Sequence, residues 1–332
     1  MKTTPSIDAV LAQWGDRLFD PHNRIVKADP APRLHRSIQE RAAVNRQRIE
    51  AAVVRRAPQA ILRIAGGGRG MGAISSHFRY ITRGGDLDIE DDRGVRHTGK
   101  ESVRDLLNQW RYSGPLIEHN SYRREAFNFV LSTPPGTDAQ LLLKAVREFA
   151  QAEMGEHLYV MVLHEDRAHP HVHLTVRNES RSGQRLPTWT ERERWRTVFA
   201  EKLRGLGIDV EATRQSARGE NRNFDTLGRL MVKGRGELHT PKAPTKTGPD
   251  YLKSRGEAAL AWAHIMKALE ASESAEDRWL AEHIAAYIRT SPFYMDVVAA
   301  RERQTARVSR TQADISLQPG SARTRTPPEF LR

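Results

Sequence analysis

A histidine-rich segment constrains the fold of this chain more than any other feature. It reads His164-Glu-Asp-Arg-Ala-His-Pro-His-Val-His173 and lies between two short apolar runs, 158–163 and 172–176. Both runs have the length and the apolar character of strands, and the turn that joins them is short. The sequence therefore predicts an antiparallel pair of strands that gathers imidazoles at one end of a sheet.

The spacing of these histidines suits a metal ion. His171 and His173 are two residues apart, so their rings project from one face of a strand. His164, at the end of the preceding strand, completes a face of three imidazoles that leaves positions open for a phosphate oxygen and water. Asp166 is the expected acceptor for one ring N–H. A polar turn with incidental histidines is the alternative, and the spacing does not separate a nuclease from another metal enzyme.

Composition restricts the chemistry further. The chain has 332 residues and no cysteine, which excludes disulfides, zinc–thiolate sites and cysteine nucleophiles. A metal must therefore be held by His, Asp or Glu. The formal net charge of +12 favours a polyanionic partner, because basic side chains release counterions from nucleic acid. A basic solubilising surface and an anionic membrane surface are the alternatives to nucleic acid.

The N-terminal sequence lacks the apolar segment that a secretory signal needs. No stretch approaches the roughly 18 consecutive apolar residues of a membrane-spanning helix. We therefore expect a cytoplasmic protein that does not insert into a membrane.

The pattern of apolar residues and breakers predicts a fold of the α+β class. A short apolar run at 59–65 ends at three glycines, and a further strand at 127–132 ends at Thr-Pro-Pro-Gly-Thr-Asp138. Asp138 can cap the helix that follows it. Helices are expected at 72–83, 100–112, 139–153, 189–206, 251–271 and 275–288.

The chain divides into five predicted segments. A basic helical arm, 1–58, precedes the core domain, 59–232. A linker at 233–250 and a helical accessory region at 251–302 follow. The tail, 303–332, is rich in Arg, Ser, Thr and Pro and is expected to be disordered. Two roles are open for the arm, namely binding of DNA or an accessory protein, and a solvated extension without a partner.

Tyr80 lies in the expected helix 72–83, between Arg79 and Arg83. A tyrosine oxygen can attack a phosphodiester to give a phosphotyrosine and a free 3′ hydroxyl, while a metal and basic residues stabilise charge on the phosphate. By itself, a tyrosine on an apolar helix is far more often a core or surface residue. The hypothesis that Tyr80 is a nucleophile therefore depends on the neighbouring motifs.

Four motifs within residues 59–222 resemble the relaxases of the Mob-P class, and within it most closely the border-nicking relaxases of T-DNA transfer systems. The first motif combines Ile-Leu-Arg63-Ile and its glycine loop with the tyrosine segment Arg79-Tyr80-Ile-Thr-Arg83-Gly-Gly-Asp-Leu-Asp-Ile. The second is Phe-Val-Leu-Ser132-Thr-Pro-Pro-Gly-Thr, and the third is the histidine segment. The fourth is Gly205-Leu-Gly-Ile-Asp-Val-Glu-Ala-Thr-Arg. The histidine segment fits the family's His-x-Asp-x-x-His-Pro-His-x-His pattern at every fixed position. Each motif is moderately specific, and their order is highly specific.

The resemblance implies the HUH-endonuclease fold, an antiparallel sheet flanked by helices, here with helical N- and C-terminal extensions. It also implies Tyr80 as the nucleophile, Ser132 as a contact to DNA beside the nick, and Mg²⁺ or Mn²⁺ bound by the three histidines. By ligand preference, three imidazoles would hold a softer metal at least as well, so the identity of the metal stays open. Arg63, Arg79 and Arg83 are the predicted DNA-binding arginines.

The implied reaction is a transesterification at an origin of transfer. Tyr80 attacks the scissile phosphate of single-stranded DNA and stays joined to the 5′ phosphate, and the released 3′ hydroxyl reverses the step after transfer. A phenol is mostly protonated at neutral pH, so the metal, Asp166 or His169 must take its proton. The sequence does not choose between these acceptors.

The resemblance also implies partners. An accessory nicking protein and a type IV coupling protein are expected, and the arginine-rich tail resembles the signals that carry such relaxases through a type IV secretion channel. A generic disordered basic tail is the alternative.

Two other functions compete with a relaxase, a rolling-circle replication initiator and a non-cleaving DNA-binding autoregulator. The tyrosine motif before the serine strand argues against the first. Intact Tyr80, His164, His171 and His173 argue against the second.

Overall fold

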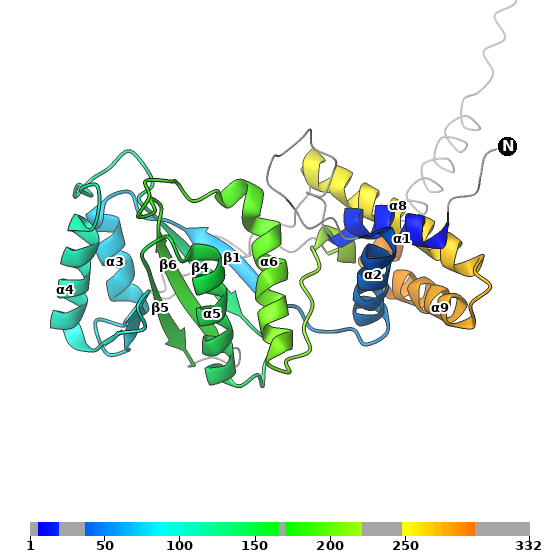
Figure 1. Ribbon diagram of the computed structural model, residues 1–332, viewed down its shortest axis with the longest axis horizontal. Coiled ribbons are helices and arrows are strands. Elements are labelled where there is room, and N and C mark those ends of the chain that lie inside the picture. Colours follow the sequence, from blue (N-terminus) through cyan, green and yellow to red (C-terminus); the bar gives the residue numbers. More distant parts are fainter. Residues whose placement is uncertain (1–5, 20–36, 166–169, 221–247, 296–332) are drawn as a thin grey trace, which may run out of the picture.

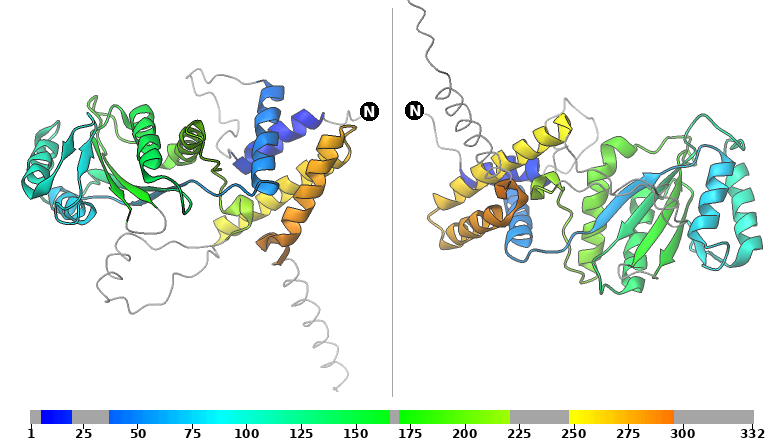
Figure 2. Two further views of the ribbon diagram at one scale, coloured as in Figure 1. Left: turned by 90° about the horizontal axis from the view of Figure 1, so that it is seen from below. Right: turned by 180° about the vertical axis from the view of Figure 1, so that it is seen from behind.

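The computed structural model describes residues 6–19, 37–165, 170–220 and 248–295. These residues form a lobe built on a β-sheet and a smaller helical lobe beside it, so the molecule is elongated (Figure 1). The two lobes are also separate when the molecule is seen from below and from behind (Figure 2). The helices described in these ranges are too short or too polar to cross a membrane.

A six-stranded sheet organises the larger lobe. Its strands are β1 (Ile61–Gly66), β2 (Ile89–Asp91), β3 (Arg96–His97), β4 (Ala126–Ser132), β5 (Tyr159–His164) and β6 (His171–Arg177). The order across the sheet is β1-β4-β6-β5-β2-β3, and all neighbours are antiparallel. The four longer strands were predicted, whereas β2 and β3, which are two or three residues long, were not. The predicted class, an antiparallel sheet flanked by helices, is confirmed.

Four helices flank this sheet. They are α3 (Met71–Ile81), α4 (Gly99–Tyr112), α5 (Ala139–Met154) and α6 (Thr188–Gly205). Each lies within two residues of its predicted bounds. Asp138 caps α5 as expected, because its carboxylate accepts hydrogen bonds from the backbone N–H groups of Gln140 and Leu141 at 2.7 and 3.2 Å.

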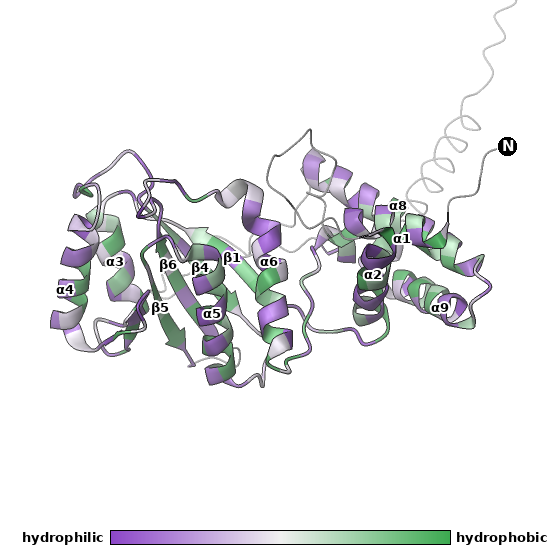
Figure 3. Cartoon of the chain, viewed as in Figure 1, coloured by the Kyte–Doolittle hydropathy of each residue, from purple (hydrophilic) through white to green (hydrophobic). Residues whose placement is uncertain are grey.

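Alternating side chains give the sheet two buried faces. On one face, Phe129 packs with Phe149 of α5 and with Trp195 of α6. On the other, Val160 and Val162 of β5 pack under α3 and α4. Figure 3 shows this arrangement as hydrophobic strands beneath helices whose outer faces are hydrophilic. The cover on the second face is incomplete at β1, where Ile61 is 38% exposed.

The helical lobe joins the two ends of the described chain. Its helices are α1 (Ile7–Phe19), α2 (Ile38–Val53), α8 (Pro249–Glu270) and α9 (Ala275–Thr290), with a short 3-10 turn η1 (Ser216–Arg218). Leu11 and Ile49 from the N-terminal helices share one core with Trp262 and Ile284 from the C-terminal helices. The predicted arm and the predicted accessory region therefore pack together. Since α8 begins at Pro249, the last two residues of the predicted linker are helical; the other segment bounds stay predictions.

Ion pairs inside this lobe occupy two of the arginines of α2. Arg46 bonds Asp8 of α1 at 2.8 Å and Asp277 of α9 at 3.1 Å. Arg41 bonds Asp16 of α1. Because carboxylates of the protein already neutralise these guanidinium groups, the arrangement favours a structural role for α2 over a DNA-binding one.

Candidate active site

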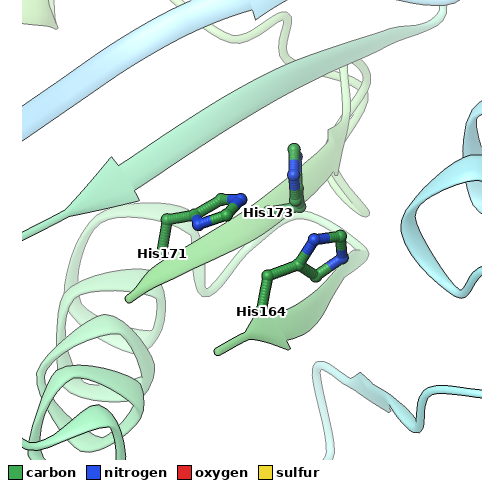
Figure 4. Close-up of side chains that lie close together, drawn as sticks. All are labelled: His164, His171 and His173. Atoms are coloured by element: carbon green, nitrogen blue, oxygen red, sulfur yellow. The ribbon is translucent and has the colours of Figure 1, made fainter. Parts of the chain in front are cut away.

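Three histidines meet at one end of the sheet. His164 ends β5 and His171 begins β6, and the two residues are direct cross-strand partners. His173, two residues further along β6, presents its ring on the same face. The centroids of the three rings lie 4.6 to 5.2 Å apart. Figure 4 shows the side chain from β5 facing the two from β6.

These imidazoles suit a single divalent cation. One ring nitrogen from each residue lies within 4.8 Å of the others. Nitrogen ligands at about 2.1 Å from one ion are about 3 to 3.5 Å apart, so small ring rotations would close the set. His164 and His173 are buried, and His171 is half-buried, which leaves a side open to a further ligand. Three neutral nitrogen donors leave the positive charge of a cation available to an anion.

The backbone of α3 orients one of these rings. His164 Nε2 donates a hydrogen bond to the carbonyl oxygen of Ile81 at 2.7 Å. Since that carbonyl can only accept, Nε2 carries the proton and Nδ1 keeps the lone pair that a metal needs. Asp166, the residue predicted for this orienting role, lies outside the described residues. Ile81 directly follows Tyr80, so the same helix end also carries the candidate nucleophile.

Tyr80 lies beside the histidines. Its ring centroid is 6.1 Å from that of His173, and the two rings meet edge to face. The side chain is half-buried at the end of α3, which packs through Ile74, Phe78 and Ile81 on the sheet. The fold thus brings a phenol and a candidate metal centre together from segments about 90 residues apart in the sequence.

Ser132 and Arg63 share the face of the sheet that carries the histidines. Ser132 is the cross-strand partner of His171 on one side and of Ile61 on the other. One row further along, Arg63 pairs with Val130, which in turn pairs with His173. Side chains directly opposite on neighbouring strands lie on the same face. Both residues therefore lie on the histidine-bearing face, between the histidines and the β1 edge of the sheet.

The other predicted site residues lie at the end of α3 or outside the described residues. Arg79 and Arg83 are exposed at and after the end of α3, and Arg83 has a left-handed backbone with φ of 54°. Asp166 and His169 lie outside the described residues, so their predicted roles stay predictions.

The sequence motifs did not single out one residue that lies beside this centre, His77. It lies one turn before Tyr80 on α3, is 5% exposed, and has its ring 6.2 Å from that of His173. The available signal was its spacing of three and four residues from Ile74 and Ile81, which places it on the buried side of the helix. The carbonyl of Ile81 had no signal, because a backbone acceptor is the same in every residue.

Comparison with known proteins agrees with this geometry. Residues 80–208 match the family model described as relaxase, MobA/VirD2-like, nuclease domain. The chain is 27% identical over 185 residues to the T-DNA border endonuclease VirD2 of Rhizobium radiobacter, covering 48% of this chain and 43% of that protein. The endonucleases of the same name from Agrobacterium fabrum and Rhizobium rhizogenes are each 26% identical over 185 residues, covering 48% of this chain and 41% and 42% of those proteins.

The alignment thus spans less than half the length of these curated relatives. The matched region begins at Tyr80 and includes β4, the three histidines, α5 and α6. The family match, the antiparallel sheet and the clustered histidines agree, and residues 80–208 are similar to the nuclease domain of MobA/VirD2-like relaxases.

Proposed function

We propose that the chain is a relaxase that nicks one strand of DNA at an origin of transfer and stays covalently attached to its 5′ phosphate. The observation that carries the proposal is the position of Tyr80, whose ring lies 6.1 Å from His173 in a cluster of three imidazoles. A nucleophile and a site for a divalent cation on one sheet face are the two elements that a phosphoryl transfer to tyrosine requires.

In the proposed reaction the Tyr80 oxygen attacks the scissile phosphorus. A phosphotyrosine bond forms, the bond from phosphorus to the 3′ oxygen breaks, and the 3′ hydroxyl leaves with a proton. One phosphoester replaces another, so no external energy source is needed and the released hydroxyl can reverse the step. Ser132, beside His171, is proposed to hold the strand next to the nick.

The three histidines are proposed to hold Mg²⁺ or Mn²⁺, and Tyr80 must lose its proton as it attacks. When bound, such a cation polarises a phosphate oxygen and lowers the charge that attack has to overcome. Asp166 and His169, next to the metal-binding residues in sequence, are proposed as proton acceptors for Tyr80. Arg63, Arg79 and Arg83 are proposed to bind phosphates of the bound strand.

We further propose how the nicked strand leaves the donor cell. The protein acts in the cytoplasm with an accessory nicking protein, and a type IV coupling protein delivers it with its strand to a secretion channel. The tail, 303–332, is the proposed signal. Its removal should leave nicking intact and abolish transfer of DNA to a recipient cell, which a mating assay with the truncated chain measures.

A selection for covalent adducts tests the central proposal without knowledge of the origin sequence. The protein is incubated with a random-sequence single-stranded DNA library and Mn²⁺, and SDS-resistant adducts are isolated and sequenced. We expect adducts that share a short motif, that EDTA prevents, and that Tyr80→Phe does not form.

Tyr122→Phe is the matched control. Tyr122 is 88% exposed and precedes β4, whereas Ser132 lies at the opposite end of that strand. Its loss should leave adduct formation unchanged. Cleavage without an adduct would instead indicate a hydrolytic nuclease, and binding without cleavage would indicate an autoregulator. Support of plasmid replication rather than transfer would indicate a rolling-circle initiator.

A further inference from the structure

His77 is a buried imidazole without a hydrogen-bond partner. It is 5% exposed and lies on the side of α3 that packs on the sheet, among Ile74, Phe78 and Ile81. Among the described residues, neither of its ring nitrogens has a hydrogen-bond partner. Buried polar groups are nearly always paired in native proteins, because an unpaired one loses its hydration without compensation. An apolar side chain at this position would avoid that loss.

The neighbours of His77 are the candidate nucleophile and a candidate metal ligand. Its ring centroid lies 6.4 Å from that of Tyr80 and 6.2 Å from that of His173. The Tyr80 and His173 centroids are themselves 6.1 Å apart, so the three rings form a nearly equilateral triangle. His77 is not one of the three residues whose ring nitrogens lie within 4.8 Å of one another, so in this geometry it is not a metal ligand.

The reaction itself identifies what can satisfy this ring. Attack by Tyr80 requires the scissile phosphodiester to reach the Tyr80 oxygen, and the His77 ring is 6.4 Å from the Tyr80 ring. An imidazole ring offers at least one N–H donor whether it is neutral or protonated. Oxygens of a phosphodiester accept hydrogen bonds and carry the negative charge that strengthens them.

We propose that His77 binds substrate, donating a hydrogen bond from its ring to an oxygen of the scissile phosphodiester. The role rests on the proposed function, and it adds a contact that holds the phosphate in line with Tyr80. The unsatisfied nitrogens of the protein without DNA are then the site of a bond that forms only when the strand is bound.

The test uses the oligonucleotide recovered from the adduct selection, with a full-length chain that carries Tyr80→Phe so that no cleavage interferes. The dissociation constant for this oligonucleotide is measured with Mn²⁺ and with EDTA. Mn²⁺ should raise the affinity of the parent chain for the oligonucleotide, and we expect this gain to be smaller by about tenfold or more in His77→Leu. A hydrogen bond to a charged oxygen usually contributes that much to binding. His77→Gln, which keeps an N–H donor, should recover part of it.

Two measurements without DNA separate this role from the alternatives. Calorimetric titration with Mn²⁺ alone should give the same affinity for His77→Leu as for the parent chain, within about threefold. The unfolding temperature of His77→Leu, without metal or DNA, should equal or exceed that of the parent, because leucine removes two unsatisfied nitrogens. The control is His157→Leu, which should unfold at a lower temperature, since His157 Nδ1 donates to the Arg177 carbonyl at 2.8 Å.

Each contrary result has a distinct meaning. Undiminished Mn²⁺-dependent binding of the oligonucleotide by His77→Leu would refute the contact while leaving the relaxase proposal intact. Loss of Mn²⁺ binding in the absence of DNA would make His77 a metal ligand instead, and a lowered unfolding temperature would make it a structural residue. If the parent chain itself gives neither an adduct nor Mn²⁺-dependent affinity, the proposed function is wrong and the role of His77 falls with it.

Discussion

Glu211 connects the two lobes, and substitution of its side chain should lower the free energy of unfolding. It follows α6 and is 3% exposed, and Arg48 of the helical lobe donates two hydrogen bonds to its carboxylate at 3.2 and 3.0 Å. The backbone carbonyl of Glu211 accepts a hydrogen bond from the N–H of Ala60, just before β1, at 3.0 Å. The Arg48 side chain is 12% exposed and also lies over the ring of Phe19. This charge pair is therefore largely shielded from water.

Glu211→Leu leaves the Arg48 guanidinium buried without its counterion. Removal of one partner of a buried pair lowers the free energy of unfolding by about 3 to 5 kcal/mol, and we expect about 3 because Arg48 keeps some contact with water. The double variant Arg48→Met/Glu211→Leu removes both charges, so it should regain about 2 kcal/mol of that loss. Scanning calorimetry on the parent, both single variants and the double variant measures the cycle.

The control lies at the same junction. Arg55 and Asp209 form an ion pair at 2.7 Å with side chains 45% and 52% exposed, and Asp209→Asn should change stability by less than about 1 kcal/mol. Two results would contradict a stabilising role for the buried pair: a loss of unfolding free energy in Glu211→Leu no larger than in Asp209→Asn, or a double variant as unstable as Glu211→Leu. Either result would mean that apolar packing alone holds the lobes together.

Other substitutions test buried polar groups, the glycine loop and the metal ligands. Burial lowers the pKa of His157 below its ordinary value of 6.5. As the pH drops below 6.5, the unfolded chain therefore takes up a proton before the folded chain does, and the free energy of unfolding falls. His157→Gln should make this fall smaller, which urea titrations at several pH values measure. Arg177, 3% exposed, donates to three carbonyls around the end of α4, so Arg177→Met should lower the free energy of urea unfolding by about 3 kcal/mol or more, and a loss under 1 kcal/mol would contradict this. A Cβ at Gly70, where φ is 89°, would lie 2.5 Å from the backbone oxygen of His119. Gly70→Ala should therefore lower the free energy of unfolding by about 2 kcal/mol or more, as measured by urea titration. His171→Ala should weaken Mn²⁺ binding in calorimetric titration about tenfold or more, and unchanged affinity would exclude His171 as a ligand.

Local pattern was sufficient for most of the secondary structure of the larger lobe. The helix after Asp138 and the strands on either side of the histidine segment were predicted within two residues, because capping and periodicity act over a few residues. The short strands β2 and β3 were missed because two or three residues carry no readable alternation. They become strands only by pairing with each other and with β5.

The helical lobe shows a different limit of the sequence. Each of its helices was expected, yet the sequence analysis kept the two ends of the chain apart as an arm and an accessory region. Trp262 packs against Phe19 edge to face, and its indole N–H donates to the carbonyl of Ala217 at 2.8 Å. Contacts between residues more than 200 positions apart leave no periodic signal in a single sequence.

The sequence by itself determined which residues are candidates for the site. The two-residue spacing of His171 and His173 places their rings on one face of any strand, and the short turn predicted that His164 would join them. It also placed Tyr80 on a helix and, through the order of its motifs, indicated the relaxase family that the comparisons support.

Only the tertiary structure decided which groups surround these residues. The carbonyl of Ile81 sets the tautomer of His164, and the packing of α3 on the sheet brings Tyr80 and His77 within about 6 Å of His173. The antiparallel register of β4 places Ser132 beside His171. These proximities arise from strand pairing and helix packing over long separations in the chain, which depend on the burial of the whole core rather than on any local pattern of residues.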